Sequence, residues 1–262
     1  MAYKTVTVRN VTLGTGLPKI CISVTAEDEE GVRTQAEAIR GCRSAGLCEW
    51  RMDCLKTVKD ENGKLDEAVI LGMLKTLRDV LGDMPLIATF RSVADGGQTE
   101  LDDLLYENLL LMVTQSGYAD IVDVEINRGE SLVMRLVKSI HSYDKTVLMS
   151  FHDFESTPEA GIMAEKLRAM ERLGADICKL ACMSADYCDA ARLIYATALA
   201  KKTVSAPIIT MAMGDTGRLS RVCGEFSGSC LSFGMLGEAS APGQIKADEL
   251  AGYIGELHTL FG

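Results

Sequence analysis

Lys179 is the residue of this sequence best placed to do chemistry, because it interrupts a short apolar run. The run Ala175–Ala181 lies between Gly174 and Ser184 and has the length and composition of a buried strand. Alternation puts Lys179 on the same face as Ile177. Burial disfavours a charged lysine and leaves a neutral amine that can attack a carbonyl carbon. The alternative is an edge-strand lysine whose charge prevents aggregation.

His152 is the second candidate, at the mouth of the preceding predicted strand. The sequence contains three histidines. His141 lies near the C-terminal end of a predicted helix, where the helix dipole favours a cation, so we expect a structural role. His258 lies on the last predicted helix, where we expect it to be exposed. The position of His152 beside a buried lysine predicts an acid–base role, and a hydrogen-bonded core histidine is the ordinary alternative.

The elements that must position these residues alternate between strand-like and helix-like segments. Eight apolar strand candidates are Ile20–Val24, Leu47–Met52, Leu86–Phe90, Ile121–Ile126, Thr146–Ser150, Asp176–Ala181, Pro207–Met211 and Cys230–Phe233. Helical patterns lie around residues 31–44, 66–81, 99–116, 130–142, 158–172, 184–200 and 244–260, with a weak one near 216–222. The alternation predicts an α/β protein with the (β/α)8 TIM-barrel fold. An open doubly wound sheet is the rival, but it usually has a Gly-rich first turn, and residues 25–28 contain no glycine.

The N-terminal segment has its own pattern. Residues 5–13 alternate in polarity and turn at Arg9-Asn10, which predicts a β-hairpin over about residues 4–14. We expect this hairpin to close the bottom of the barrel. No stretch resembles a linker, so we expect a single barrel domain over residues 1–262.

Two helix ends are marked by their residue types. Thr157-Pro158-Glu159 predicts a helix start, with Thr157 as the capping residue and proline in the first position. Gly174, just past the end of the same pattern, predicts the helix stop.

The residues at the C-terminal strand ends matter most, because the chemistry of such a barrel lies there. Polar side chains occur at nearly all eight ends, which solvation alone does not explain, whereas the bottom ends show no comparable set. The residues at or just after these ends are Ser23, Glu49, Arg51, Asp53, Arg91, Asp123, Glu125, His152, Lys179, Met213, Arg221, Ser232, Ser240 and Gln244.

The acidic residues in this set have two interpretations. Asp53 shares a strand face with Glu49 and Arg51, where it can contact a ligand or belong to a buried ion-pair network. Asp123 and Glu125 repeat the alternation, and we expect them to fix the lysine or an arginine from behind.

The overall charge limits the choice of partner. The chain has 262 residues and a formal net charge of −10, which argues against nucleic acid or an anionic membrane surface. A small anionic ligand would need local arginines, and Arg51, Arg91 and Arg221 are candidates, with Arg91 expected to contact the ligand. No apolar run is long enough for a membrane span, and residues 1–5 lack a signal-peptide pattern. Nine scattered cysteines without a C-x-x-C pair indicate reduced thiols in a cytoplasmic protein and no structural zinc site.

Five motifs carry a family resemblance. They are Glu49-Trp50-Arg51-x-Asp53, Thr89-Phe90-Arg91, Ser150-x-His152-Asp153-Phe154, Ala175-Asp176-Ile177-x-Lys179 and Ala239-Ser240-Ala241-Pro242-Gly243-Gln244. In order and spacing they resemble type I 3-dehydroquinate dehydratases over essentially the whole chain. The resemblance implies dehydration of 3-dehydroquinate to 3-dehydroshikimate in the shikimate pathway, through an imine and without metal or cofactor. It also implies a homodimer.

The resemblance assigns roles residue by residue. Lys179 matches the Schiff-base lysine, His152 the proton-transfer histidine and Arg221 the arginine that binds the substrate carboxylate. The positions that match contacts to the ring hydroxyls and the carboxylate region are Ser23, Glu49, Arg51, Arg91, Ser240 and Gln244. Met213 and Phe233 match apolar walls.

One position departs from the family pattern. The family usually has glutamate before the Gly-Gly pair that follows the Thr-Phe-Arg motif, and this carboxylate orients the histidine. Here the residue is Asp95, one methylene shorter. We expect Asp95 to reach His152 through a loop shift or a water, with looser geometry and a rate lower by about 10- to 100-fold.

Two rival functions follow from the same features. An aldolase would share the fold and the buried lysine, but aldolases of this type usually bind phosphorylated sugars. The nearest phosphate cradle is the weak candidate Gly214-Asp215-Thr216-Gly217. A non-catalytic carboxylate-binding barrel is the second rival, motivated by Asp95.

Overall fold

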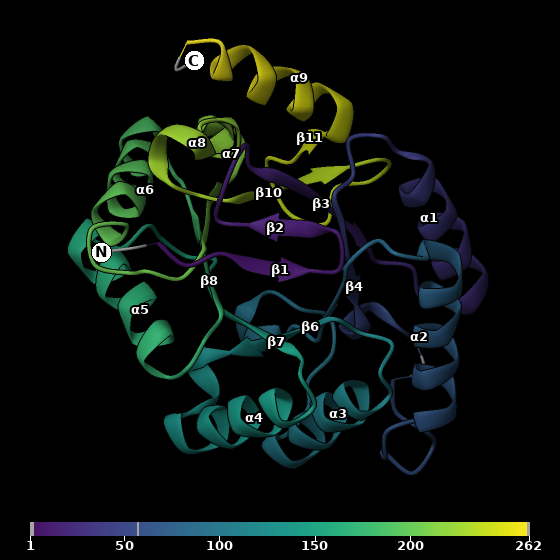
Figure 1. Ribbon diagram of the computed structural model, residues 1–262. Helices are drawn as coiled ribbons and strands as arrows, with labels where there is room; N and C mark the ends of the chain where they lie inside the picture. The colour runs from purple at the N-terminus through teal and green to yellow at the C-terminus, as the bar shows by residue number, and fades with distance from the viewer. Residues whose placement is uncertain (1–2, 57, 261–262) are drawn as a thin grey trace.

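The computed structural model describes residues 3–56 and 58–260 and shows a parallel β-barrel surrounded by helices (Figure 1). The expected domain limits at residues 1 and 262 lie outside these ranges. The barrel strands are β3 (Lys19–Val24), β4 (Leu47–Arg51), β5 (Leu86–Thr89), β6 (Ile121–Glu125), β7 (Thr146–Asp153), β8 (Ile177–Met183), β9 (Ile208–Met213) and β10 (Leu231–Met235). They pair in the order β10-β3-β4-β5-β6-β7-β8-β9, which confirms the (β/α)8 prediction. β7 extends past its predicted end at Ser150 to Asp153.

The barrel closes between its last two strands. Ser229 and Ile208 form a parallel bridge, and the backbone amide of Cys230 donates to the Ile208 carbonyl at 2.8 Å. A short strand β11 (Ile245–Lys246) then pairs with the end of β10. All the pairings are parallel, so the C-terminal ends of the eight strands meet at one mouth.

Helices cover the outside of the barrel (Figure 1). The long ones are α1 (Glu29–Gly41), α2 (Glu67–Leu81), α3 (Asp103–Gln115), α4 (Glu130–Ser142), α5 (Ala160–Arg172), α6 (Tyr187–Ala200) and α9 (Ala247–His258). The weak helix after β9 consists of two short pieces, α7 (Arg218–Val222) and α8 (Gly224–Ser227). Short 3-10 turns follow four strands: η1 (Met52–Cys54), η2 (Val93–Asp95), η3 (Ile126–Arg128) and η4 (Asp215–Gly217).

The predicted start of α5 is wrong. Helix α5 begins at Ala160 with Glu159 in the capping position, and no side chain caps it. The Thr157 hydroxyl instead donates to the carbonyl of Met183 at 2.6 Å, which ties the loop to the end of β8. The predicted stop is confirmed, because Gly174 has a left-handed φ of +96° that glycine adopts without strain.

The predicted hairpin is present and closes the bottom of the barrel. Its strands are β1 (Val6–Val8) and β2 (Val11–Leu13), and Val8 and Leu13 pack with the lowest layer of inward-facing barrel side chains. Figure 1 shows the hairpin lying across that end. The Arg9 Nε donates to Asp120 Oδ1 at 2.8 Å, and Asp120 also binds Arg78. Contrary to our expectation, the bottom of the barrel therefore does carry a set of charged side chains. These side chains anchor the hairpin.

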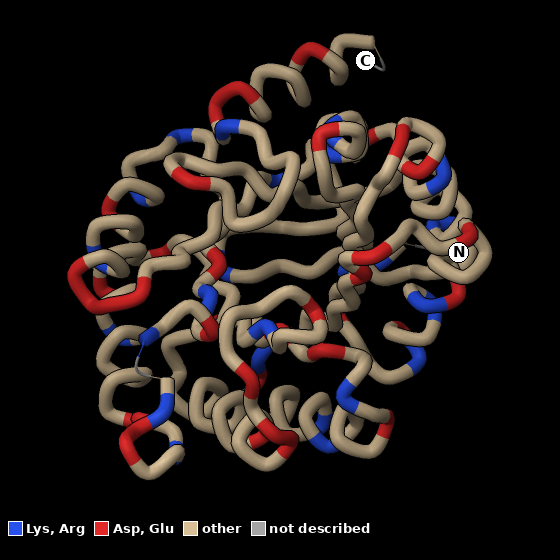
Figure 2. The backbone as a smooth tube through the Cα atoms, turned by 180° about the vertical axis from the view of Figure 1, so that it is seen from behind, with Lys and Arg blue, Asp and Glu red and all other residues tan. Residues whose placement is uncertain are grey.

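Strand alternation separates two apolar regions. Ile177 and Ala181 belong to the cluster inside the barrel, whereas Cys178, Leu180 and Cys182 pack between sheet and helices. The face predicted for Lys179 is therefore correct. Figure 2 shows charges of both signs spread over the outer helices and loops. All nine cysteines are free thiols. In the described residues, no helix is long and apolar enough to span a membrane.

The hairpin makes a testable contribution to stability. Leu13 is 1% exposed, so Leu13→Ala leaves a cavity in the bottom layer and should destabilise the fold by about 2–4 kcal/mol. Thr7→Ala on the exposed face of β1 is the control and should change the free energy of unfolding by less than about 0.5 kcal/mol. Urea titration followed by fluorescence of the single, buried Trp50 measures both. Equal midpoints for the two variants would show that the hairpin does not support the barrel.

Candidate active site

The mouth of the barrel holds a cavity of about 220 Å³. Every residue to which the family resemblance assigns a role lines it except Ser23. The cavity is lined by Glu49, Arg51, Arg91, Asp95, Gly96, His152, Phe154, Lys179, Ala181, Met211, Met213, Arg221, Phe233, Ser240, Ala241, Pro242 and Gln244. Ser23 lies behind the cavity, where its hydroxyl donates to Glu49 at 2.7 Å. Ser232 is not among the lining residues, because it lies on the outer face of β10.

Lys179 projects from β8 into the cavity and is 4% exposed. Its Nζ lies 3.5 Å from Oε1 of Glu49 and 4.4 Å from the centroid of the Phe233 ring. Glu49 also accepts hydrogen bonds from Ser23 and, at 3.0 Å, from Thr89. Burial alone would raise the pKa of Glu49, but the charges of Lys179 and Arg51 and the Ser23 hydrogen bond lower it to about 2. The lysine amine is thus held beside a permanent carboxylate and an aromatic face.

His152 lies on β7, next to the strand that carries Lys179, and pairs in register with Ala181. Burial lowers the pKa of His152 well below its ordinary value, and the positive charges of Arg91, Lys179 and Arg51 lower it further. The ring is therefore a neutral base at pH 7. Its Nδ1 is buried and forms no hydrogen bond with any described group.

Asp95, at the end of η2, is the nearest carboxylate to this ring. Its Oδ2 lies 3.5 Å from Nδ1 of His152, too far and too poorly aligned for a hydrogen bond, and accepts instead from the His152 backbone amide at 3.2 Å. Oδ1 accepts from Asn127 at 3.4 Å. Burial raises the pKa of Asp95 to about 6, with a further contribution from Glu125. The shorter side chain thus holds the histidine's backbone and stops short of its ring.

Arg91 is held by a dense network under the cavity. Its guanidinium donates to Asp123 at 2.6 Å, to Glu125 at 3.1 Å and to the Ser150 hydroxyl at 2.8 Å. The expectation that Asp123 and Glu125 fix an arginine from behind is confirmed. Arg91 still lines the cavity, but its charge is compensated by two buried carboxylates.

Arg51 is also compensated. It donates two parallel hydrogen bonds of 2.8 Å to Asp53, which is fully buried in η1 just past the end of β4. Asp53 further accepts from the backbone amides of Arg91 and Gln98, so it ties the ends of two strands together. The ion-pair interpretation of Asp53 is therefore correct. Because Arg51 and Arg91 are both paired with carboxylates, they contribute less net positive charge to the cavity than we expected.

Arg221, on α7, is the arginine of the cavity without a carboxylate partner among the described residues. It is 1% exposed, and burial lowers its pKa to about 10. One terminal nitrogen donates to the Pro242 carbonyl at 2.9 Å, whereas Nε has no described partner. A buried, unpaired guanidinium is a strong site for a carboxylate, which it binds through two nitrogens.

The loop that contains Ser240 and Gln244 lies across the mouth. The Gln244 side chain accepts from the Ser240 amide at 2.8 Å and donates to the Ser240 hydroxyl at 2.9 Å. The Ser240 hydroxyl in turn lies 3.3 Å from that of Ser23. The Gly214 amide donates to the Pro242 carbonyl at 3.2 Å, which fastens the loop to the end of β9.

Sequence reasoning missed six lining residues. Met211 and Ala181 could have been found, because alternation puts them on the inward face with Met213 and Lys179. Ala241 and Pro242 follow from the position of the loop. Nothing in the sequence marked Gly96 and Phe154 as lining residues, because their contact depends on the conformation of two loops.

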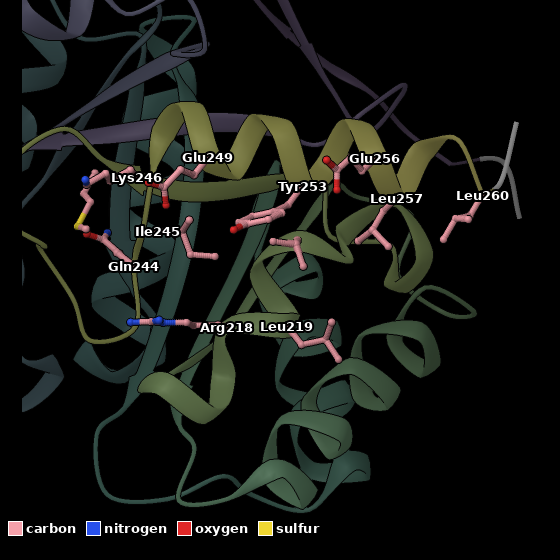
Figure 3. Close-up of a pocket in the computed structure, with 12 residues that line it drawn as sticks. Arg218, Leu219, Gln244, Ile245, Lys246, Glu249, Tyr253, Glu256, Leu257 and Leu260 are labelled. Carbon is pink, nitrogen blue, oxygen red and sulfur yellow. The ribbon is translucent and has the colours of Figure 1, made fainter.

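A larger groove of about 900 Å³ lies outside the barrel between α7 and α9 (Figure 3). Leu219, Tyr253, Leu257 and Leu260 give it an apolar wall, and Gln244 joins it to the rim of the cavity. No histidine or cysteine is among the described residues that line it. Within residues 3–56 and 58–260, no group of three potential ligands is arranged to hold a metal ion.

Comparison with known structures gives full-length matches. A type I 3-dehydroquinate dehydratase from Clostridium difficile, solved with covalently modified comenic acid, superposes with a TM-score of 0.92 at 34% identity, covering 98% of this chain and 99% of the other. A 3-dehydroquinate dehydratase from Geobacillus kaustophilus also has a TM-score of 0.92, at 32% identity, covering 98% and 97%.

Sequence comparison agrees. A 3-dehydroquinate dehydratase from Bacillus licheniformis is 39% identical over 256 residues, which are 97% of this chain and 98% of the relative. One from Listeria welshimeri is 38% identical, covering 98% and 99%. The type I 3-dehydroquinase family model matches residues 20–260, and with this match and these relatives the chain belongs to the type I 3-dehydroquinase family.

Proposed function

We propose that this chain dehydrates 3-dehydroquinate to 3-dehydroshikimate in the shikimate pathway, through an imine formed by Lys179. The observation that carries the proposal is the position of the lysine, 4% exposed in one cavity with a neutral histidine and an unpaired arginine. Family membership supports the reaction, and the covalently modified comenic acid of the C. difficile relative supports a covalent step.

The substrate is an anionic cyclic keto acid, and its carboxylate is the group that Arg221 fits. The carboxylate would take the unpartnered Nε and compete with the Pro242 carbonyl for the terminal nitrogen. The hydroxyls and the rest of the ring are then left to Glu49, Arg51, Arg91, Ser240 and Gln244, with Ser23 acting through Glu49. Met213 and Phe233 form the apolar walls.

The chemistry follows from an electron sink. Lys179 first loses its ammonium proton to solvent, and its amine then adds to the ketone carbon. Water leaves with uptake of a proton, and the resulting protonated imine acidifies the neighbouring C–H bond. Neutral His152 takes that proton, and the electron pair forms an enamine. The enamine expels the β-hydroxyl while the protonated His152 donates its proton to that hydroxyl, which leaves as water. Hydrolysis of the imine releases product and regenerates the amine, and no metal or cofactor is needed.

A single group that removes and returns the proton acts from one face of the ring. This geometry predicts a syn elimination, in which the proton and the hydroxyl leave from the same side. Burial supports His152 in this role, because its lowered pKa keeps the free enzyme's imidazole neutral at pH 7.

Asp95 is the third member of the proposed set. It holds the His152 backbone at 3.2 Å and, when ionised, stabilises the imidazolium that forms during the reaction. Its elevated pKa of about 6 means that this help is present above pH 6 and fades below it.

The rival functions gain little from the structure. The Gly214–Gly217 segment is used internally, since the Gly214 amide donates to Pro242 and the Gly217 amide donates to Gly214. It offers a poor cradle for a sugar phosphate, so nothing favours the aldolase. A non-catalytic carboxylate-binding barrel differs from the enzyme only in turnover and imine formation.

We also propose that this chain forms a homodimer and works in the cytoplasm. The groove between α7 and α9 supports self-association, because Leu219, Tyr253 and Leu260 expose 58%, 49% and 73% of their surface there. Arg218 on α7 and Glu256 on α9 also place opposite charges on the two walls of the groove, as a contact between two copies of one surface requires. The nine free thiols suit a reducing compartment. A solution mass of one chain by light scattering would rule the dimer out.

Reductive trapping tests the central step. Borohydride added with 3-dehydroquinate should fix a covalent adduct on the peptide that contains Lys179, as measured by mass spectrometry. Lys179→Met should abolish the adduct and lower kcat by at least about 10³-fold. The control is Lys201→Met, since Lys201 also lies over an aromatic ring, 4.0 Å from Tyr3, but far from the cavity. Normal turnover by Lys179→Met would refute the mechanism.

Replacing the histidine separates imine formation from proton transfer. His152→Ala should still give some trapped adduct, because Lys179 remains, but should lose about 10²- to 10⁴-fold in kcat. His141→Ala is the control, since its ring binds Asp176 at 2.8 Å at the N-terminal end of β8, opposite the mouth. Wild-type turnover in His152→Ala would remove this residue from the mechanism.

The raised pKa of Asp95 predicts a pH-dependent change in stability. Its carboxylate is harder to ionise in the fold, so the wild type loses stability as pH rises from about 4 to 6 and then levels off. Asp95→Asn should therefore be stabilised relative to wild type by about 3 kcal/mol at pH 8 and by less than about 1 kcal/mol at pH 4. Asp95→Glu keeps an ionisable group and should retain the pH dependence. Thermal unfolding of the three proteins between pH 4 and 8 gives the answer, and a pH-independent difference for Asp95→Asn would contradict the assignment.

A further inference from the structure

Phe154 is a cavity residue for which the proposed reaction supplies no role. It follows β7 directly and is 36% exposed at the mouth. Its direction is fixed by Asp153, whose Oδ1 accepts from the backbone amides of Glu155 at 3.0 Å and Ser156 at 2.9 Å. Such a side-chain turn fixes the backbone just after a strand. This turn therefore directs the Phe154 ring over the cavity.

The ring of Phe154 rests on Gly96. A Cβ atom placed on Gly96 would lie only 2.2 Å from Cε2 of Phe154, and Gly96 has a left-handed φ of +87°. Both facts require glycine at this position. The neighbouring Gly97 has the same need, because its Cβ would lie 1.8 Å from the Arg91 carbonyl oxygen. The two glycines therefore allow the loop after β5 to pass close to the Phe154 ring and to the Arg91 carbonyl.

The same ring also lies near the proposed base. The rings of Phe154 and His152 are nearly parallel, at an interplanar angle of 23° with centroids 6.5 Å apart. Gly96 directly follows Asp95, whose Oδ2 accepts from the His152 amide. Phe154 thus contacts the loop that carries the acid and lies beside the histidine ring.

We infer that Phe154 and Gly96 form a clamp that positions His152 against Asp95 and keeps water from the imidazole. The two are positioning residues, since they act through the histidine. The clamp is needed because the direct link is incomplete: Nδ1 of His152 lies 3.5 Å from Asp95 Oδ2 and makes no hydrogen bond with a described group. The inference rests on the proposed function only in calling His152 the base.

Charged groups on several elements act on the ring that the clamp covers. Arg91 after β5, Lys179 on β8 and Arg51 on β4 disfavour the imidazolium, and Asp95 is the nearest carboxylate. Lys166 on α5 adds a positive charge within range of Asp95. These charges stay in place when the aromatic ring is removed, so only the hydration of His152 changes. Added water favours the charged form and raises its pKa towards the ordinary value.

The first test is an NMR titration of the histidine ring protons in the free protein. The chain has three histidines, and His152→Ala identifies the signal of interest by its absence. In the wild type this signal should not titrate between pH 5 and 8. In Phe154→Ala its midpoint should move upwards by about one pH unit or more, whereas Phe154→Leu, which keeps an apolar cover, should behave like the wild type. A Phe154→Ala signal identical to the wild type overturns the clamp.

The second test is kinetic. Phe154→Ala should lower kcat by about 10- to 100-fold with little change in KM, and the acid limb of its pH profile should move in the same direction as the NMR midpoint. Phe154→Leu should recover most of kcat. Gly96→Ala, which pushes the ring away, should reproduce the defect, with circular dichroism as the check on folding. A loss confined to KM, or an unmoved pH profile, overturns the inference.

The two hypotheses fail in different ways. Borohydride trapping at Lys179 should persist in Phe154→Ala, because the lysine is unchanged. If no variant and no wild-type protein forms the adduct, the proposed function is wrong, and the NMR titration still decides whether Phe154 shields His152. If trapping is normal and both readouts of Phe154→Ala match the wild type, only the clamp is wrong.

Discussion

The compensation of buried charge at the barrel mouth is the constraint on which the rest of this structure depends. Charged side chains project inwards from the strand ends, where each would be unstable alone. Pairing resolves this: Lys179 lies beside Glu49, and Arg91 lies between two carboxylates. Removing one member of such a pair typically destabilises a protein by about 3–5 kcal/mol, because the other charge stays buried. The pairs therefore fix the positions of the side chains before any ligand arrives.

Three groups depart from this pattern, and all three line the cavity. Arg221 has no described carboxylate partner, His152 is held neutral by its surroundings, and Asp95 is harder to ionise than usual. The unpaired arginine costs the fold stability until an anion binds it, whereas the surroundings of His152 keep its ring in the neutral form that can accept a proton. Perturbed groups gathered in one cavity are typical of functional sites, whereas the paired charges beneath them are structural.

The sequence was sufficient for everything that strand alternation controls. It predicted the eight strands, the face of Lys179, the mouth position of His152 and the hairpin at the bottom. It did not show which charges pair, because Arg91 meets Asp123 and Glu125 only through the register of neighbouring strands. The conformations of the loops could not be predicted from the sequence either. Thr157 looks like a helix cap in sequence but bonds to Met183, and the contact between Phe154 and Gly96 joins two loops that are far apart in the chain.

Asp95 connects the perturbed charges of the cavity with the conformation of its loops. A glutamate there would add one methylene and extend the reach of the carboxylate. With the shorter side chain, the carboxylate holds the backbone of β7, and the ring is left with an unbonded Nδ1. An imidazole without that hydrogen bond needs another constraint on its orientation, because proton transfer tolerates little misplacement. Aromatic packing can supply such a constraint without adding charge. We therefore infer that the orientation of the proposed base, His152, depends on both a carboxylate that anchors the strand and a phenyl ring that covers the imidazole.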